Sequence, residues 1–418
     1  MYKPDDRQND SDIDGLGSRV LRVLQAIGEQ TILYLANDET EAESLALVLD
    51  AMLPEAPVVY LPASDALPGD DAPASPANVG RRVTALRQLR ALSAGKNGSA
   101  AIVISSGEAA ARRYARPTAF DAAPPMIRPG DAIDPEAFLA ASLASGYFAD
   151  DRIDEPGEIA VRGEVIDLYP ADAGGPVRID IADGRIAAIH HFDPVTQRRE
   201  ASCDALEIGR AAEPENASDA TLLDHFSPGT VLFSPQAEKR RKRFIRLAER
   251  AAKEMAAEVD AVSNKRWTAS LAHWRTESDL LDEAEITIEA VPRFAESRST
   301  SRAVKRFIAA EQNEGRCVAL IGSGRDIRFL RTRLQAVFSD DKEIADIREL
   351  EKLDVRKVAT LVAPLDRGAR DKRITLIAAA DILGTRALIE QGSQLAKPAG
   401  LGGAEIRIGD LVIHENYG

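Results

Sequence analysis

The chain has 418 residues, 44% of them hydrophobic and 29% charged, with 53 Lys and Arg against 67 Asp and Glu. A chain of this length exceeds what one hydrophobic core supports, so we expect about three or four domains. The formal net charge of −14 opposes strong unaided binding to DNA through phosphate contacts.

Cysteine usage and the N-terminal sequence predict a protein of a reducing compartment. Cys203 and Cys317 are the two cysteines, far apart and outside any CxxC pattern, which argues against a disulfide framework or a zinc site. The start, MYKPDDRQNDSD, has no apolar core of a signal peptide, and nowhere do about 18 apolar residues follow one another. We therefore expect a cytoplasmic protein with no membrane span.

Short apolar runs alternate with amphipathic segments in the first part of the chain. This alternation predicts a parallel sheet covered by helices, because parallel strands need crossover connections and are buried on both faces. The expected elements are strand 31–35, helix 39–52, strand 58–61, a proline-rich loop at 62–78, helix 79–92 and strand 101–105.

The next segment predicts a small antiparallel sheet. A short helix at 135–145 precedes a strand at 158–169, in which Gly163 indicates a bulge that turns Arg162 outward. Asp183-Gly184 then predicts a two-residue hairpin turn. In that register Ile181 faces Ile186, Ile179 faces Ala188 and Val177 faces His190, whereas Arg178, Asp180, Ala182, Arg185 and Ala187 share the polar side.

Strand 229–235 and a charged helix follow, and Phe244, Leu247 and Ala251 form the expected packing stripe of that helix. The basic run 239–243 suggests a nucleic-acid patch, but acidic Glu249, Glu254 and Glu258 downstream favour a solvated face. A last α/β segment has helix 301–312, strand 317–322, helix 326–338 and strands 358–362 and 374–379. A glycine-rich linker leads to a final strand in 406–418.

Signs of catalysis are weak. A nucleotide loop needs GxxxxGK[ST], and neither GLGSRV at 15–20 nor GSGRD at 322–326 has the Gly-Lys-Ser/Thr ending. LLDEAE at 280–285 lacks the buried strand that a metal-holding box needs, and the five histidines show no ligand spacing. We therefore predict no catalytic residues, no metal and no cofactor.

Two blocks of sequence, PGEIAVRGEVIDLYP and PVRIDIADGRIAAIHHFDPVTQRR, resemble the segment that the bacterial transcription-repair coupling factor family (Mfd) shares with the excision-repair protein UvrB. YLPASDALPGDDAPASPANVGRRVTALRQL, ADILGTRA and IRIGDLVIHENYG are also similar to that family. The resemblance is specific over about 31–210 and 374–418, and faint between them.

The resemblance implies an α/β multidomain fold, in which a UvrB-like parallel-sheet domain is split by a small antiparallel α+β insertion module. A second α/β domain and a C-terminal β start follow. The implied parts are a degenerate nucleotide fold (1–125), a UvrA-binding module (126–205), the second part of the UvrB-like domain (206–297), a connector (298–396), and a linker with the first strand of the RNA-polymerase-interacting domain (397–418).

The implied function is a noncatalytic adaptor that recruits UvrA to stalled RNA polymerase for nucleotide-excision repair. The family's DNA translocase motor would lie beyond residue 418, and the loop 62–78 has no aromatic residue to probe damaged DNA. Two alternatives are a UvrB-type ATPase using Gly15 to Ser18, and an RNA-polymerase-binding fragment acting through 405–418. Asp410, Val412 and His414 would begin the polymerase module.

By the same resemblance the UvrA-facing arginines are Arg162 and Arg178, with Gly163 shaping the surface. A guanidinium on a solvent-exposed sheet face offers a planar fork for a partner's carboxylates. The alternative is internal pairing of Arg162 with Asp167 or Glu164, and of Arg178 with Asp180. Ala182 replaces an aromatic residue of the family interface, so we expect weaker binding or a hydrophobic anchor elsewhere.

Overall fold

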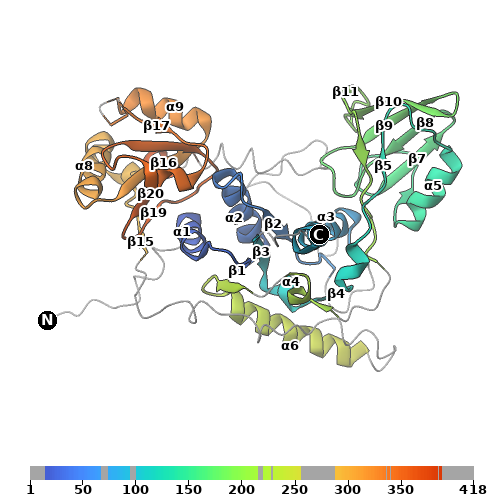
Figure 1. The fold of residues 1–418 in the computed structure, drawn as a ribbon, viewed down its shortest axis with the longest axis horizontal. Helices are drawn as coiled ribbons and strands as arrows, with labels where there is room; N and C mark the ends of the chain where they lie inside the picture. Colours follow the sequence, from blue (N-terminus) through green and yellow to red (C-terminus); the bar gives the residue numbers. More distant parts are fainter. Residues whose placement is uncertain are drawn as a thin grey trace, which may run out of the picture. The chain divides into compact units, whose positions relative to one another are not determined.

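The first apolar segments form a parallel four-stranded sheet in the computed structural model (Figure 1). The structure describes residues 15–66, 74–94, 100–214, 220–226, 229–255, 288–335, 337–338, 340–384 and 386–387. The strand order is β14-β1-β3-β2, and the predicted strands and crossover helices are confirmed with small shifts at their ends. The strands are β1 (Ile32–Ala36), β2 (Val58–Leu61), β3 (Ile102–Ser106) and β14 (Thr230–Phe233).

Among the residues that the structure describes, five helices accompany this sheet. Every residue of β1 and β3 is buried, as expected for strands covered on both faces. Asp38 begins the second helix by accepting a hydrogen bond from the Glu41 amide at 2.9 Å. The helices are α1 (Leu16–Ala26), α2 (Glu39–Met52), α3 (Pro76–Ala94), α4 (Gly107–Ala111) and α6 (Ala237–Met255).

Strand β14, which completes this sheet, is separated in sequence from β3 by residues 107–229. By its contacts the described part of the chain divides into two compact units, one formed by the residues up to 123 together with those from 214 onward and one formed by residues 124–213. We call the first the α/β unit and the second the antiparallel unit. The α/β unit is thus interrupted in sequence, and the short pair β4 (Arg113–Tyr114) and β13 (Ala220–Thr221) joins the two sides of the interruption.

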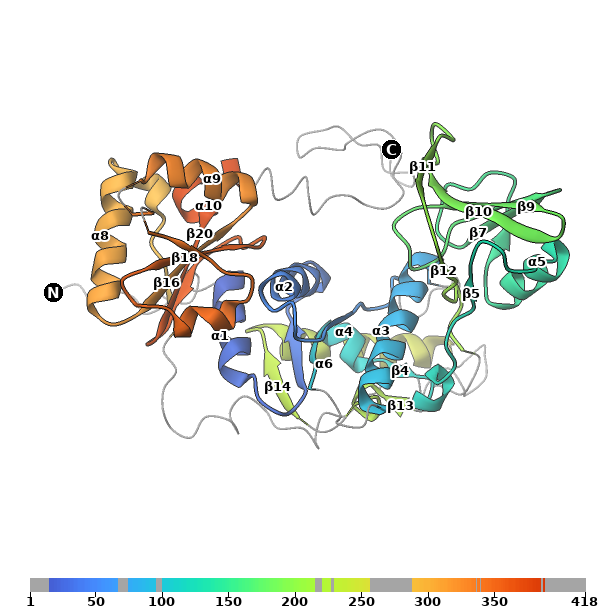
Figure 2. The same cartoon turned by 45° about the horizontal axis from the view of Figure 1, so that its top comes forward.

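A second sheet occupies the C-terminal half of the α/β unit (Figure 2). Its order is β15-β19-β20-β16-β18-β17, parallel from β20 to β17 and antiparallel at β19 and β15. Its elements are β15 (Glu289–Ala290), α8 (Thr300–Asn313), β16 (Cys317–Gly322), α9 (Gly324–Arg333), β17 (Lys342–Glu343), β18 (Val358–Val362), β19 (Ala369–Arg370), β20 (Ile374–Ala378) and α10 (Ala379–Leu383), with 3₁₀ turns at Phe294–Glu296 and Ile347–Lys352.

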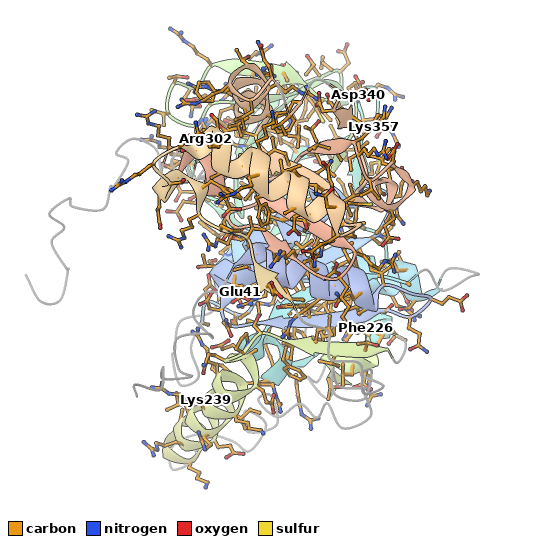
Figure 3. The ribbon with its side chains drawn as sticks, turned by 90° about the vertical axis from the view of Figure 1, so that its left-hand side faces the viewer. Glu41, Phe226, Lys239, Arg302, Asp340 and Lys357 are labelled. Atoms are coloured by element: carbon orange, nitrogen blue, oxygen red, sulfur yellow. The ribbon has the colours of Figure 1, made fainter. Side chains whose placement is uncertain are left out.

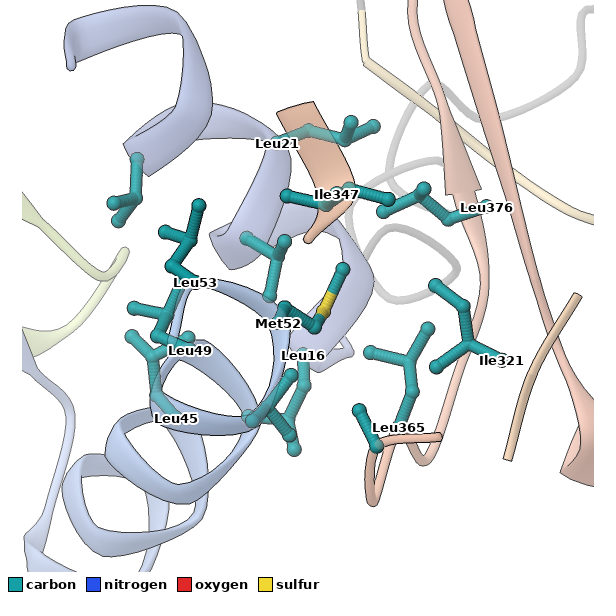
Figure 4. Packing of buried hydrophobic residues seen from close by; sticks show 14 of the residues in the cluster. Leu16, Leu21, Leu45, Leu49, Met52, Leu53, Ile321, Ile347, Leu365 and Leu376 are labelled. Carbon is teal, nitrogen blue, oxygen red and sulfur yellow. The ribbon is translucent and has the colours of Figure 1, made fainter. Parts of the chain in front are cut away.

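One hydrophobic cluster joins the two sheets of the α/β unit. Leu21 of α1 and Met52 of α2 are fully buried with Ile321 and Leu376 of the second sheet and Ile347 of the turn before β18 (Figure 4). The sequence suggested a separate connector over 298–396, whereas in the structure this region shares its core with α1 and α2. The two sheets therefore stabilise each other through a common apolar interior.

The antiparallel unit is a six-stranded sheet in the order β11-β10-β9-β8-β7-β6 with α5 (Pro135–Ala144) against one face. The expected boundary at 205 differs from the structure, because β12 (Leu206–Glu207) pairs with β5 (Met126–Ile127) and keeps the chain in this unit to 213. The six strands are β6 (Phe148–Ala149), β7 (Glu158–Arg162), β8 (Val165–Leu168), β9 (Val177–Ala182), β10 (Arg185–Phe192) and β11 (Arg199–Ser202).

The packing stripe predicted for α6 is correct at Phe244 and Ala251, which are partly buried, and wrong at Leu247. Leu247 is half exposed, whereas Ala237 and Ala248 are fully buried and Phe244 is partly buried. The buried side therefore follows 237, 241, 244, 248 and 251, with 248 in place of 247. Among the described residues, none of the helices combines the length and apolar composition that crossing a lipid bilayer requires.

Candidate functional site

The two faces of the antiparallel sheet differ sharply in character. Alternate residues of β7 to β10, such as Ile159, Ile166 and Ile179, are buried toward α5 in one apolar cluster. The intervening positions carry Arg162, Asp167, Arg178, Asp180 and His190 on the opposite side, because successive side chains of a strand point to opposite faces. We call this opposite side the polar face.

The stretch 158–169 is a hairpin, which corrects the prediction of one strand with a bulge. Arg162 pairs with Val165, so Gly163 and Glu164 form a two-residue turn. Gly163 has φ +62° and Glu164 is not left-handed, as in a type II′ turn, whose first central position favours glycine. Gly163 therefore brings β7 back onto β8, and the two strands place Arg162 and Asp167 on one face.

The hairpin at Asp183-Gly184 forms as predicted, with φ of +50° and +70° at these residues. The predicted register beyond Ile186 is wrong, because a bulge between Ile186 and Ala188 adds one residue to β10. Ile179 thus faces Ile189, and His190 lies beside Arg178 on the polar face. The bulge keeps the apolar side continuous by returning Ile189 to it.

Asp167 is the shared acceptor of both predicted arginines. Its side chain is 3% exposed, and Arg178 donates to its two oxygens at 2.6 and 2.8 Å. Arg162 Nη1 approaches the same carboxylate at 3.2 Å. The bond with Asp167 raises the pKa of Arg178, and its guanidinium lies 4.9 Å from the Phe192 ring centre, a cation–π distance.

The two arginines differ in their exposure to solvent and in the hydrogen-bond donors that remain for a partner. Arg178 is 21% exposed and is held by Asp167, Phe192 and Gln197, the last at 3.2 Å. Arg162 is 52% exposed and also donates to the backbone carbonyl of Asp151. Since a guanidinium has five N–H donors, Arg162 retains donors that face solvent. Internal pairing therefore occurs, through Asp167 rather than through Glu164 or Asp180.

A groove of about 310 Å³ lies beside Arg162, between residues 151–153 and the turn at 194–197. Val195, at its rim, is 61% exposed, the largest exposed fraction among the large hydrophobic residues that the structure describes. Gln197, with φ +58°, closes the turn and donates to Pro194 at 2.9 Å. Sequence reasoning missed Val195, although the motif DPVTQ at 193–197 is a recognisable turn.

The remaining predicted positions are less informative. Ala182 is exposed at the end of β9, and the register Val165 with Asp180 puts it level with Gly163. His190 is buried beside Asp180, 3.8 Å away, and burial lowers its pKa. Asp410, Val412 and His414, like LLDEAE at 280–285, lie outside the described residues.

The glycine-rich start of α1 is occupied by the chain itself. The Leu16 amide donates to Asp366 Oδ1 at 3.0 Å and the Gly17 amide to the Arg367 carbonyl at 3.1 Å. A β-carbon on Gly17 would lie 2.4 Å from that carbonyl oxygen. The position where a phosphate would meet the first amides of a helix thus holds a carboxylate of the second sheet. Within the described ranges no group of His, Cys, Asp or Glu is arranged to hold a metal ion.

The unit built around Arg162 and Asp167 has a known counterpart. The family model of the UvrB interaction domain matches residues 126–213. The resemblance to transcription-repair coupling factors is confirmed. Relatives of that name are 26% identical over 182 residues in Bacillus subtilis (strain 168) and over 189 in Staphylococcus aureus (strain MSSA476), and 36% identical over 87 residues in Staphylococcus epidermidis (strain RP62A).

These matches cover a limited part of each protein. The aligned regions span 44% and 45% of this chain for the first two relatives and 21% for the third. They span 15%, 16% and 7% of the relatives themselves. The matched region is thus a small part of the length of these coupling factors, and the residues that the UvrB interaction domain model matches include the polar face described above.

Proposed function

We propose that the antiparallel unit is the docking surface for UvrA in an adaptor region that serves transcription-coupled excision repair. The observation that carries this proposal is the half-exposed guanidinium of Arg162, held in place by Asp167 but with donors left for a partner. A carboxylate of UvrA would complete its hydrogen bonds in a planar, charge-assisted contact. The similarity of residues 126–213 to the UvrB interaction domain supports the same partner.

Arg178 has a different role in this proposal. Because both oxygens of Asp167 accept from Arg178, this arginine fixes the carboxylate that orients Arg162. Arg178 is thus a positioning residue, whereas Arg162 touches the partner. Val195, at the rim of the neighbouring groove, would supply the apolar contact that Ala182 does not provide.

We also propose that this stretch of the chain is noncatalytic and delivers UvrA to RNA polymerase through other parts of the coupling factor. Asp366 at the start of α1 argues against the ATPase alternative, since its carboxylate would repel a phosphate there. A titration with ATP tests this point, and binding in the micromolar range with hydrolysis would contradict it. The polymerase contact through 405–418 stays a prediction.

The docking proposal is tested by calorimetry of the whole chain with purified UvrA. Arg162→Ala should weaken binding roughly 10- to 100-fold, the range for a lost charge-assisted hydrogen bond. Arg162→Glu should weaken it further because it repels the same carboxylate. Arg128→Ala is the matched control, an exposed arginine of the same unit directly after β5. Equal affinity of wild type and Arg162→Ala would refute the assignment.

A further inference from the structure

Helix α6 presents two different faces. The side that packs on the α/β unit holds Ala237 and Ala248, which are fully buried, with Arg241 and Phe244 partly buried between them. The outer side carries six solvent-exposed basic side chains at helical spacing, with the exposed carboxylate of Glu249 beside them. Figure 3 shows side chains projecting from this helix near Lys239. The six basic residues, the basic stripe, are Lys239, Lys242, Arg243, Arg246, Arg250 and Lys253.

The charges of the basic stripe are largely uncompensated. Arg240 and Arg241, at the margin, are paired with Asp38 at 3.1 Å and Glu238 at 2.7 Å. Within the stripe Lys242 is paired with Glu238 at 3.3 Å, and the other five cations form no ion pair with any described residue. The helix as a whole has eight basic and three acidic residues. Positive charge is therefore concentrated on the exposed side of α6, although the net charge of the whole chain is −14.

We propose that the basic stripe binds the phosphate backbone of duplex nucleic acid. At about 1.5 Å rise per residue, the stripe from Lys239 to Lys253 is roughly 21 Å long. A duplex offers one negative charge per about 1.7 Å of axis, so several phosphates come within reach of long, unpaired side chains whatever the base sequence.

This contact is local and electrostatic, which reconciles it with the negative charge of the chain. The sequence favoured a solvated face because Glu249, Glu254 and Glu258 follow the basic run. In the structure Glu249 is exposed and forms no ion pair with a described residue, whereas Glu238, before the run, pairs with Arg241 and Lys242. The remaining cations share one exposed side. The inference does not depend on UvrA docking, because it concerns the α/β unit and a different ligand.

The test is fluorescence anisotropy of the whole chain with a labelled duplex of about 20 base pairs between about 50 and 200 mM salt. About five phosphate contacts predict a slope of log affinity against log salt of roughly −4.5. The variant Lys239→Gln, Arg243→Gln, Arg246→Gln, Arg250→Gln should lose at least about 10-fold in affinity at the lowest salt and most of the slope.

A control variant removes the same number of exposed cations elsewhere in the α/β unit: Arg298→Gln, Arg302→Gln, Lys305→Gln, Arg306→Gln. It should bind within about twofold of wild type, and equal losses in both variants would show a general charge effect and overturn the proposal. Arg246→Gln alone should reduce the slope by about one and covers the case of a poorly folded multiple variant. No duplex binding by wild type, or equally effective competition by polyglutamate, would also overturn it.

Discussion

Arg178 donates to both oxygens of the buried Asp167 carboxylate, at 2.6 and 2.8 Å, across the ladder between β8 and β9. This pair is the fixed base of the polar face, and Arg162 is attached to it through the same carboxylate. The relationship separates a residue that holds the surface together from one that is available to a partner.

Removing the shared acceptor should destabilise the antiparallel unit. Asp167→Asn leaves two guanidinium groups without their carboxylate and should lower the free energy of unfolding by about 2–3 kcal/mol. This is less than the roughly 3–5 kcal/mol for breaking a fully buried pair, because Arg178 is partly exposed. Hydrogen exchange of β8 and β9 amides in the intact chain measures this local change. Asp180→Asn is the matched control and should cost less than about 1 kcal/mol, since its partner Arg199 is largely exposed. Similar effects of the two variants would contradict the role of Asp167.

The turn between β7 and β8 should not accept a β-branched residue. Gly163 has φ +62°, and Gly163→Val should cost roughly 1–2 kcal/mol through backbone strain, although a β-carbon there meets no neighbour. Gly175→Val, at an open position without positive φ, should be nearly neutral. Hydrogen exchange of the β7–β8 hairpin distinguishes them, and equal protection in the two variants would show that the turn tolerates a side chain.

The groove beside Arg162 should contribute to UvrA binding. Val195→Asp places a charge on the exposed apolar rim and should weaken binding about 10-fold or more, whereas folding should be unaffected because the side chain is 61% exposed. Thr196→Asp is a control with the same added charge at the neighbouring position. If UvrA affinity falls equally in both variants, the effect is one of charge alone and Val195 is not an anchor.

The start of α1 should reject a methyl group. In an open helix Gly→Ala stabilises by up to about 1 kcal/mol, but the β-carbon of Gly17→Ala would meet the Arg367 carbonyl at 2.4 Å. We expect a loss of about 1–3 kcal/mol, the usual range for overpacking. Urea unfolding of Gly17→Ala measures this loss. Gly28→Ala is the control, because a β-carbon on Gly28 would meet no atom within 4 Å. A stabilised Gly17→Ala variant would show that α1 and β19 do not pack as described.

The α/β unit should lose stability in mild acid through His225. Burial lowers the pKa of this histidine to about 4, and it stacks edge-on against Tyr114 and Phe120. In the unfolded chain this imidazole is therefore protonated below about pH 6.5, whereas in the folded chain it stays neutral until about pH 4. The contribution of the neutral His225 to the free energy of unfolding is therefore complete above pH 6.5 and is lost as the pH falls toward 4.

His225→Phe removes this linkage while keeping an aromatic ring in the cluster. Between pH 7 and about 4.5 the wild type should lose roughly 2–3 kcal/mol more than His225→Phe, as measured by urea unfolding at both pH values. Parallel pH dependence of the two proteins would mean that His225 titrates normally in the folded state.

The apolar runs in the sequence were sufficient to predict the parallel central strands of both sheets of the α/β unit and the turn at Asp183-Gly184, because burial on two faces and positive φ leave local marks in composition. The UvrB-like character of residues 126–213 was also readable from sequence. Arg162 and Arg178 could be named as candidates, but their different exposure could not.

Only the tertiary structure decided which partners those side chains have. Asp167 could have paired with either arginine, and a one-residue bulge in β10 changed the register that alternation had predicted. The occupation of α1 by Asp366 involves residues 350 positions apart. Such contacts depend on how elements far apart in the sequence pack against one another. The hydrophobic periodicity within each element contains no information about that packing.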